Sequence, residues 1–284
     1  MHHNKKTVVL TLIATVLAMN VFFAGLLAYA LSAAKERKEG EVRATVENMA
    51  LLLDQSVNAS VREIDLLLRE MQDHLEGELR AGGRLDRDAV NARIAARKGW
   101  LSQPVEIRVT DDAGTVVLGQ GVTPQTRVSS ADREFFIAHR THDDGRTRVS
   151  KLLFGRVTGA WITVFSRRFN APDGRFAGVV AAAVPAAHFQ ELLSGLQLGT
   201  HGIALIRDVD KVMIARWPVL DSPAGAIGTQ GGSQELSDIV ASGVQAQSFY
   251  STRTADGVTR INAYRRLASM PAFVVVGWGE KDYL

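Results

Sequence analysis

The sequence predicts an α+β fold, in which a membrane-spanning helix and a long stalk helix precede two tandem modules with antiparallel sheets. Three observations support this: an uncharged apolar run at residues 7–31, an apolar repeat in three- and four-residue steps from 41 to 79, and a strand–acidic turn–strand pattern that occurs twice. The predicted segments are 1–6 (cytoplasmic N-terminus), 7–31 (transmembrane helix), 36–99 (stalk and packing helices), 100–196 (membrane-distal module) and 197–284 (membrane-proximal module).

The first apolar run is long enough to span a bilayer, which needs about 20 such residues. A cleaved signal peptide is the alternative, because residues 28–30 and 32–34 resemble small-residue cleavage sites, but its apolar region is usually about 7–15 residues long. The Lys and Arg residues on the two sides do not decide the orientation. We expect a single-pass anchor in the bacterial inner membrane, with the chain from about residue 32 onward in the periplasm.

Composition excludes several classes of function. The formal net charge is +3 and the arginines are scattered, so the chain lacks the basic stripe of a nucleic-acid-binding protein. It has no cysteine, and its seven histidines show no HxH or HExxH spacing, so neither a disulfide framework nor a metal site is expected. No GxSxG elbow or GxxxxGK[ST] loop occurs. We therefore expect no cofactor and no catalytic activity.

After the membrane run, the apolar stripe of residues 41–79 predicts a long helix that breaks at 81–84, followed by a second helix at 87–98. The stripe either packs on the following modules or pairs with a second copy, and we expect parallel homodimerisation from Val42 to about Val57. The remaining pattern predicts strands at 105–110, 115–119, 148–155, 161–169, 176–184, 202–208, 211–217, 245–253, 258–267 and 272–279, and helices at 131–140, 186–196 and 233–243.

The order of these motifs resembles the double Cache sensor family. The resemblance is carried by "DREFFIAH" (132–139), "GRVTGAWITVFSRRFNAPDGRFAGVVAAAV" (155–184) and "LGTHGIALIRD" (198–208). It implies two PAS-like halves behind a long helix, in the ligand-sensing region of a bacterial transmembrane signalling receptor. These segments are most similar to the sensor regions that precede GGDEF diguanylate cyclase domains, and histidine kinases have similar sensors. Such receptors begin a second membrane helix where this chain ends, so we expect a fragment, with a natural remnant as the alternative.

Two departures from the family limit what the resemblance implies. Amino-acid-binding members carry a Tyr-Arg-Trp-Tyr cluster and a late-strand Asp, where this sequence has Arg133, Phe135, Phe136 and Ala183. An amino-acid ligand is therefore not implied. The segment "GGSQEL" (231–236) lacks the acidic residue of GGDEF and is expected to cap the helix that follows. The alternative function is a membrane-anchored periplasmic protein-interaction module that binds no small molecule.

A candidate ligand site follows from alternation along the strand at 161–169. Trp161, Thr163 and Arg167 share one face and form a mixed aromatic and polar set, whereas Ile162 and Val164 on the other face suit packing against the long helix. An inward Arg167 suits a carboxylate or phosphate, so we expect a small anionic ligand, with Arg168 at the helix-side edge. The alternative is that Arg167 pairs with Asp132 or Glu134 as a structural brace. The predicted ligand-binding residues are Arg133, Phe136, His139, Trp161, Thr163 and Arg167.

Overall fold

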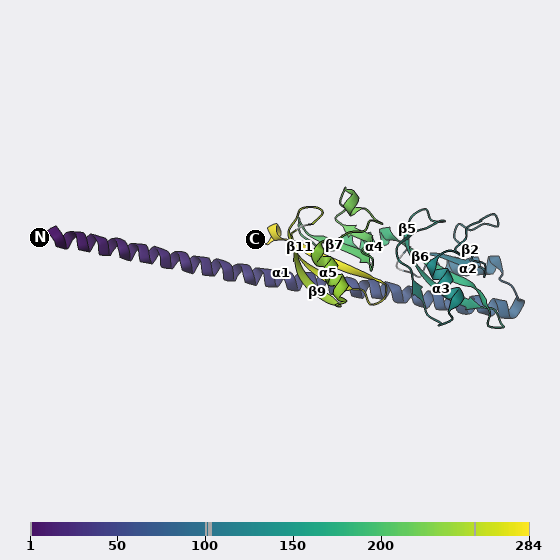
Figure 1. The fold of residues 1–284 in the computed structure, drawn as a ribbon. Coiled ribbons are helices and arrows are strands. Elements are labelled where there is room, and N and C mark those ends of the chain that lie inside the picture. Colours follow the sequence, from purple (N-terminus) through teal and green to yellow (C-terminus); the bar gives the residue numbers. More distant parts are fainter. Residues whose placement is uncertain (1, 100, 102–103, 253, 284) are drawn as a thin grey trace.

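A single helix, α1 (His2–Gly82), forms the axis of the molecule in the computed structural model, which describes residues 2–99, 101, 104–252 and 254–283. Two β-sheet modules lie one after the other along its C-terminal half, and its N-terminal half projects away from them (Figure 1). We call the module beside the projecting half the proximal module and the other the distal module. The predicted α+β class is confirmed. The segment boundary predicted at residue 100, and residues 253 and 284, lie outside the described residues.

Helix α1 continues without a break from the apolar run into the stalk. With 81 residues at about 1.5 Å each, it is roughly 120 Å long. Among the described residues it is the one helix apolar and long enough to cross a membrane, by length and composition. It ends where expected: Gly83 adopts φ +70° and donates its N–H to Leu79 O at 2.9 Å, a left-handed C-terminal cap.

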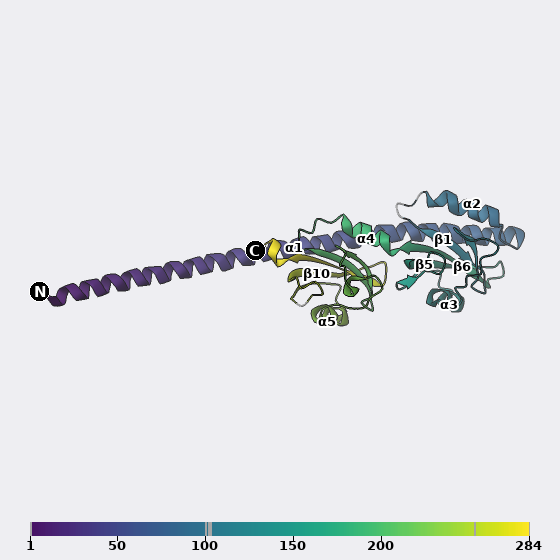
Figure 2. The same ribbon diagram turned by 90° about the horizontal axis from the view of Figure 1, so that it is seen from above.

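Helix α2 (Arg87–Lys98) returns along the end of α1 (Figure 2) and also contacts the sheet, since its Asn91 Oδ1 accepts the backbone N–H of Gly119 at 3.0 Å. Asp86 caps its N-terminus by accepting the N–H groups of Asp88 and Ala89 at 2.9 and 3.2 Å. Glu70 of α1 accepts two hydrogen bonds from Arg97, with the shorter at 3.0 Å, and these bonds fix α2 against α1.

The distal module contains one antiparallel sheet in the order β2-β1-β6-β5-β3, with β4 also paired to β5. The strand predicted at 148–155 is divided in two, because Ser150 Oγ between the halves accepts the backbone N–H of Val164 at 2.9 Å. The helix predicted at 131–140 begins later, at Arg133 as N-cap rather than after Ser130. The elements are β1 (Glu106–Thr110), β2 (Val116–Gly119), α3 (Glu134–Thr141), β3 (Arg148–Val149), β4 (Leu153–Phe154), β5 (Trp161–Asn170) and β6 (Phe176–Pro185).

The proximal module repeats this design with a five-stranded sheet in the order β8-β7-β11-β10-β9. Apart from the extra short strand, the spatial order matches that of the distal sheet, so the tandem repeat read from the sequence is present in the fold. The elements from the linking helix onward are α4 (Ala186–Ser194), β7 (Ile203–Asp208), β8 (Met213–Trp217), η1 (Pro223–Gly225), α5 (Gln234–Ser242), β9 (Ala246–Ser251), β10 (Arg260–Arg266), β11 (Ala272–Gly279) and η2 (Glu280–Asp282).

The apolar stripe of α1 packs against one face of both sheets, and α3 and α5 lie on the opposite faces (Figure 2). Val46 and Leu53 are 0% and 4% exposed, covered by this chain's own proximal module. The dimer contact predicted from Val42 to Val57 is therefore wrong in its residues, because these side chains already belong to the core of one chain. Apolar residues on the α1-facing side of both sheets pack against the stripe, so the stripe is already used within one chain.

Candidate functional site

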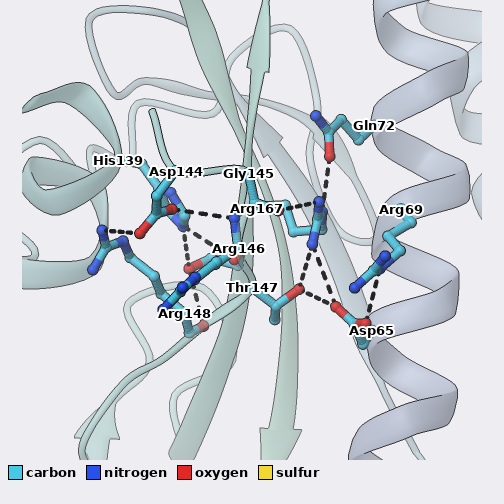
Figure 3. A network of polar contacts seen from close by, with 11 residues as sticks. Asp65, Arg69, Gln72, His139, Asp144, Gly145, Arg146, Thr147, Arg148 and Arg167 are labelled. Atoms are coloured by element: carbon cyan, nitrogen blue, oxygen red, sulfur yellow. Dashed lines mark hydrogen bonds and ion pairs between the residues drawn. The ribbon is translucent and has the colours of Figure 1, made fainter. Parts of the chain in front are cut away.

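Arg167 points from β5 toward the stalk helix, on the side of the sheet opposite His139 (Figure 3). Its Nε donates to Gln72 Oε1 at 2.8 Å, and its Nη1 lies 3.4 Å from Asp65 Oδ1. The same guanidinium donates to Gly145 O at 2.6 Å and to Thr147 Oγ1 at 3.0 Å. With five donors and four partners, Arg167 is a brace between α1, β5 and the loop before β3. Arg167 therefore has the structural role of the alternative given above, but its carboxylate partner is Asp65 and not Asp132 or Glu134.

The two faces of β5 are the reverse of the prediction. Ile162 and Val164 lie on the α3 side with Phe135, and Thr163 lies with Arg167 on the α1 side, fully buried, its Oγ1 without a partner in the described residues. Arg168 points toward α3, where its Nη1 donates to His139 O at 3.0 Å. The cause is that β5 is buried on both faces, so apolar side chains could not identify the helix-facing one.

Phe136 and His139 hold α3 on the sheet. Phe136 is fully buried and meets Phe176 edge to face, with ring centroids 5.5 Å apart. His139 is 1% exposed, and its Nε2 lies 3.0 Å from Ser166 O and 3.1 Å from Ser166 Oγ. Burial lowers the pKa of His139 to about 4, so the ring is neutral at physiological pH. His139 is therefore a neutral contact between α3 and β5.

Trp161 lies at the junction of the two modules. It is 37% exposed and packs edge to face on Phe154, with ring centroids 5.6 Å apart. A Cβ on Gly228 of the proximal module would lie 2.6 Å from the indole ring, so the two modules touch at this point. Lys151 and Asp210 add an ion pair between the modules at 2.5 Å. Trp161 thus contacts both modules and does not line a pocket with Arg133.

The distal module has a cavity of about 60 Å³ between the outer face of its sheet and the start of α3. This is several times the space that one water needs, about 10–15 Å³. Of the six predicted residues, Arg133 alone lines it, and Ala183 of the late strand lines it too. The lining residues are Glu106, Arg108, Thr110, Val116, Val128, Ser130, Arg133, Phe135, Leu153, Gly155, Arg156, Val157, Ile162, Val164, Ala181 and Ala183.

Three arginines surround this cavity, and their carboxylate partners differ. Arg108 pairs with Glu106, and Arg156 pairs with Asp132 through two hydrogen bonds of 2.6 Å. Arg133 donates to Phe154 O at 2.9 Å and forms no ion pair within the described part of the chain. Burial, and then the charge of Arg156, lower the pKa of Arg133. Arg133 is therefore the positive group best placed to meet an anion.

Arg108 and Arg156 were not among the predicted ligand-binding residues, although the alternation of its strand predicts the position of Arg108. Arg108 alternates with Ile107 and Val109, both fully buried in the core beside α1, so period two directs Arg108 to the cavity side. Arg156 lies in the turn between β4 and β5, where alternation gives no direction. Its position depends on the reach of its side chain back to Asp132 and Ser129 O.

Several solved structures are similar to this chain. An extracellular domain assigned to a histidine kinase, rpHK1S-Z16, is 23% identical, with a TM-score of 0.73 over 88% of this chain and 97% of that one. The ligand-binding domain of Mlp24, solved with asparagine, is 15% identical, with a TM-score of 0.61 over 87% and 96%. The periplasmic sensory domain of the Campylobacter jejuni chemoreceptor Tlp1 is 10% identical, with a TM-score of 0.66 over 84% and 95%.

The chain has the fold of these sensor domains. This is the fold that the double Cache resemblance implied, and at these identities the likeness concerns the fold alone. No protein-family model matches the chain, and no curated protein sequence matches it. Within this sensor fold, the distal cavity with Arg133 at its edge is the candidate functional site.

Proposed function

We propose that this chain is the extracytoplasmic ligand-sensing region of a bacterial transmembrane signalling receptor. The distal cavity carries the proposal, because it lies between α3 and the sheet and Arg133 beside it has no carboxylate partner in the described residues. The sensor fold and the apolar half of α1 support it. In this proposal α1 crosses the inner membrane once, and the chain from about residue 32 onward lies in the periplasm.

The ligand is a small molecule that combines an anionic group with an apolar body. Arg133 offers a planar donor fork that suits a carboxylate or phosphate. The floor of the cavity is apolar, with Phe135, Ile162 and Val164 from α3 and β5. At the late-strand position, Ala183 provides no carboxylate for an ammonium group, so the proposed ligand is not an α-amino acid bound in the family's manner.

The output is carried by a further domain of the full receptor, a diguanylate cyclase first and a histidine kinase second. The geometry suits transmission along α1, because η2 (Glu280–Asp282) ends beside the point where α1 leaves the folded body (Figure 1). The charge of Glu39 on α1 acts on Tyr283 directly after η2, raising its pKa in addition to the effect of burial. The first and last parts of the sensor are therefore adjacent.

The receptor is a homodimer through the outer face of the stalk. Leu52 and Leu66 are 60% and 67% exposed, and Ala59 lies halfway between them. The seven-residue spacing places all three on one line of α1, the repeat that two parallel helices use. A shared bilayer raises the effective concentration of the second copy, so a short apolar line suffices.

Thermal unfolding of the full chain in lipid nanodiscs, followed by circular dichroism against a library of small carboxylates and phosphates, tests the ligand proposal. We expect at least one anion to raise the midpoint, since a ligand at 100 times its Kd adds about 2.7 kcal/mol. Arg133→Gln should weaken that ligand at least tenfold, while Arg140→Gln on the exposed side of α3 serves as the matched control. If Arg133→Gln binds as wild type, the site is wrong. If no small molecule binds and a periplasmic protein co-purifies, the interaction module replaces the sensor.

A further inference from the structure

The proximal module has a larger pocket than the distal one. It lies between α5 and the sheet face that turns away from α1, and its volume is about 390 Å³. Three buried arginines line it, Arg207 on β7, Arg216 on β8 and Arg260 on β10, with exposures of 5%, 9% and 3%. Arginine is almost never this buried unless a group of opposite charge pairs with it.

Of these three arginines, Arg207 is the one that forms no ion pair with a described residue. Its Nη1 donates to two backbone carbonyls, Lys211 O at 2.6 Å and Thr229 O at 3.3 Å. Its Nε is buried and has no hydrogen bond in the described residues. Its Nη2 likewise makes none there and faces Gly231, where an added Cβ would lie 4.0 Å away. Two of its nitrogens therefore retain donors that no protein group uses.

The other two arginines share one carboxylate. Asp256 Oδ2 accepts from Arg260 Nη2 at 2.7 Å and from Arg216 Nη2 at 2.9 Å. Asp256 is the single carboxylate among the described lining residues, against three guanidinium groups. Among the described lining residues, positive groups therefore outnumber negative ones by three to one, and the nearby Asp208 lies outside the lining. Arg216 also has a buried Nε with no partner in the part of the chain that the structure describes.

Electrostatics and backbone both favour an anion here. Burial first, and then the like charge of Arg216, lower the pKa of Arg207 to about 10. The segment Gly231–Gly232–Ser233 lines the pocket at the N-terminus of α5, with Ser233 as N-cap, so the positive end of that helix is close by. The helix cap expected from "GGSQEL" is confirmed, and Gly231 in the same segment leaves open space beside Arg207.

The rest of the lining is apolar. Leu205 on β7 and Val275 on β11 are paired on adjacent strands and form the floor of the pocket. Phe249 on β9 lines one side of it. We propose that this pocket is a second ligand site, in which Arg207 and Arg216 bind the carboxylate or phosphate of a small organic anion whose apolar body packs on Leu205, Phe249 and Val275. This site goes beyond the proposed distal sensing and does not depend on it, because the two pockets share no residue.

Calorimetric titration of the full chain in nanodiscs at constant ionic strength tests this site. The probes are hexanoate, the uncharged hexanamide of the same size, and inorganic phosphate. We expect hexanoate or phosphate to bind and hexanamide not to bind. Arg207→Gln and Arg216→Gln should each raise the Kd at least tenfold, while Arg266→Gln at the exposed end of β10 leaves it unchanged. Arg133→Gln should also leave it unchanged, which separates this site from the distal cavity.

A second variant keeps the test valid if removing a buried arginine harms folding. Gly231 has an ordinary φ, and a Cβ there would meet nothing closer than Arg207 Nη2. Gly231→Leu should therefore fold, keep every buried charge and block the pocket, so that anion binding is lost while the circular dichroism spectrum is retained. The proposal is overturned if neither anion binds, if hexanamide binds as well as hexanoate, or if folded Arg207→Gln, Arg216→Gln and Gly231→Leu all bind as wild type.

Discussion

Arg167 on β5 and Asp65 on α1 form an ion pair, with 3.4 Å between Nη1 and Oδ1, that joins the distal sheet to the stalk helix. The arginine side chain is 7% exposed and the aspartate 27%, so the pair is largely shielded from water. Thr147 donates a further hydrogen bond to the same carboxylate, which brings in the loop before β3. Asp54 and Arg265 repeat this arrangement in the proximal module, at 3.2 Å. Each sheet is thus tied to α1 by an arginine from the sheet and an aspartate from the helix.

Removal of the Arg167 guanidinium should destabilise the fold without any ligand present. Arg167→Gln leaves Asp65 without its buried partner and removes the bond to Gly145 O, so we expect a loss of about 2–4 kcal/mol in the free energy of unfolding. Arg69→Gln is the matched control, because Arg69 pairs with the same Asp65 but its side chain is 59% exposed, a pair worth under about 1 kcal/mol. Urea unfolding followed by circular dichroism measures both. Equal losses in the two variants would contradict the brace.

Burial of His139 should make the distal module lose stability in mild acid. The folded-state pKa is about 4, below the ordinary 6.5, so the unfolded chain binds the proton first as the pH falls. Stability is then full above about pH 6.5 and declines by up to about 1.4 kcal/mol per unit between pH 6.5 and 4. His139→Gln should remove this part of the pH dependence. Urea midpoints of both proteins at pH 7.5 and 5 measure the difference, and parallel declines would refute the assignment.

The sequence predicts the elements well and the orientation of their side chains less well. The limits of β11 and of α2 match the expected ranges because apolar runs bounded by turns or caps define them. The face of β5 could not be read in the same way, since residues 162–167 are all buried. The stalk did offer a clue to this orientation. Asp65 and Gln72 lie seven residues apart beside the apolar stripe, and both accept hydrogen bonds from Arg167 of the sheet.

The proximal pocket was beyond sequence reasoning for a different reason. Its arginines come from three strands, and Arg207 and Arg260 are 53 residues apart in the sequence. Only the pairing of the strands in the sheet brings them together. Arg216 lies opposite Leu205, while β11 and β10 bring Arg260 to the same face. One sequence read along its length shows three isolated arginines in apolar strands. Long-range pairing turns them into one positively charged pocket.

The proposed dimer predicts which stalk positions cross-link. The chain has no cysteine, so single substitutions need no background changes. In native membranes Leu52→Cys, Ala59→Cys and Leu66→Cys should form intermolecular disulfides, because these positions lie exposed along one line of α1. Val46→Cys and Leu53→Cys should not, since their side chains are covered by the chain's own sheet. Cross-linking on non-reducing gels that is strongest at 46 and 53, or equal at all five, would contradict this dimer.

Ligand binding in the distal cavity should shift α1 against the proximal sheet by about an ångström or two, the scale of many switching transitions. Two places report this movement: Glu39 and Tyr283 at the end of the folded body, and Glu47 and Ser248, which are hydrogen bonded between α1 and β9. The double variants Glu39→Cys/Tyr283→Cys and Glu47→Cys/Ser248→Cys should form intramolecular disulfides at rates that change at least twofold when ligand is added. Adding Arg133→Gln to either pair removes the ligand's effect but not the basal rate. Identical rates with and without a ligand that demonstrably binds would show that α1 does not move in this way.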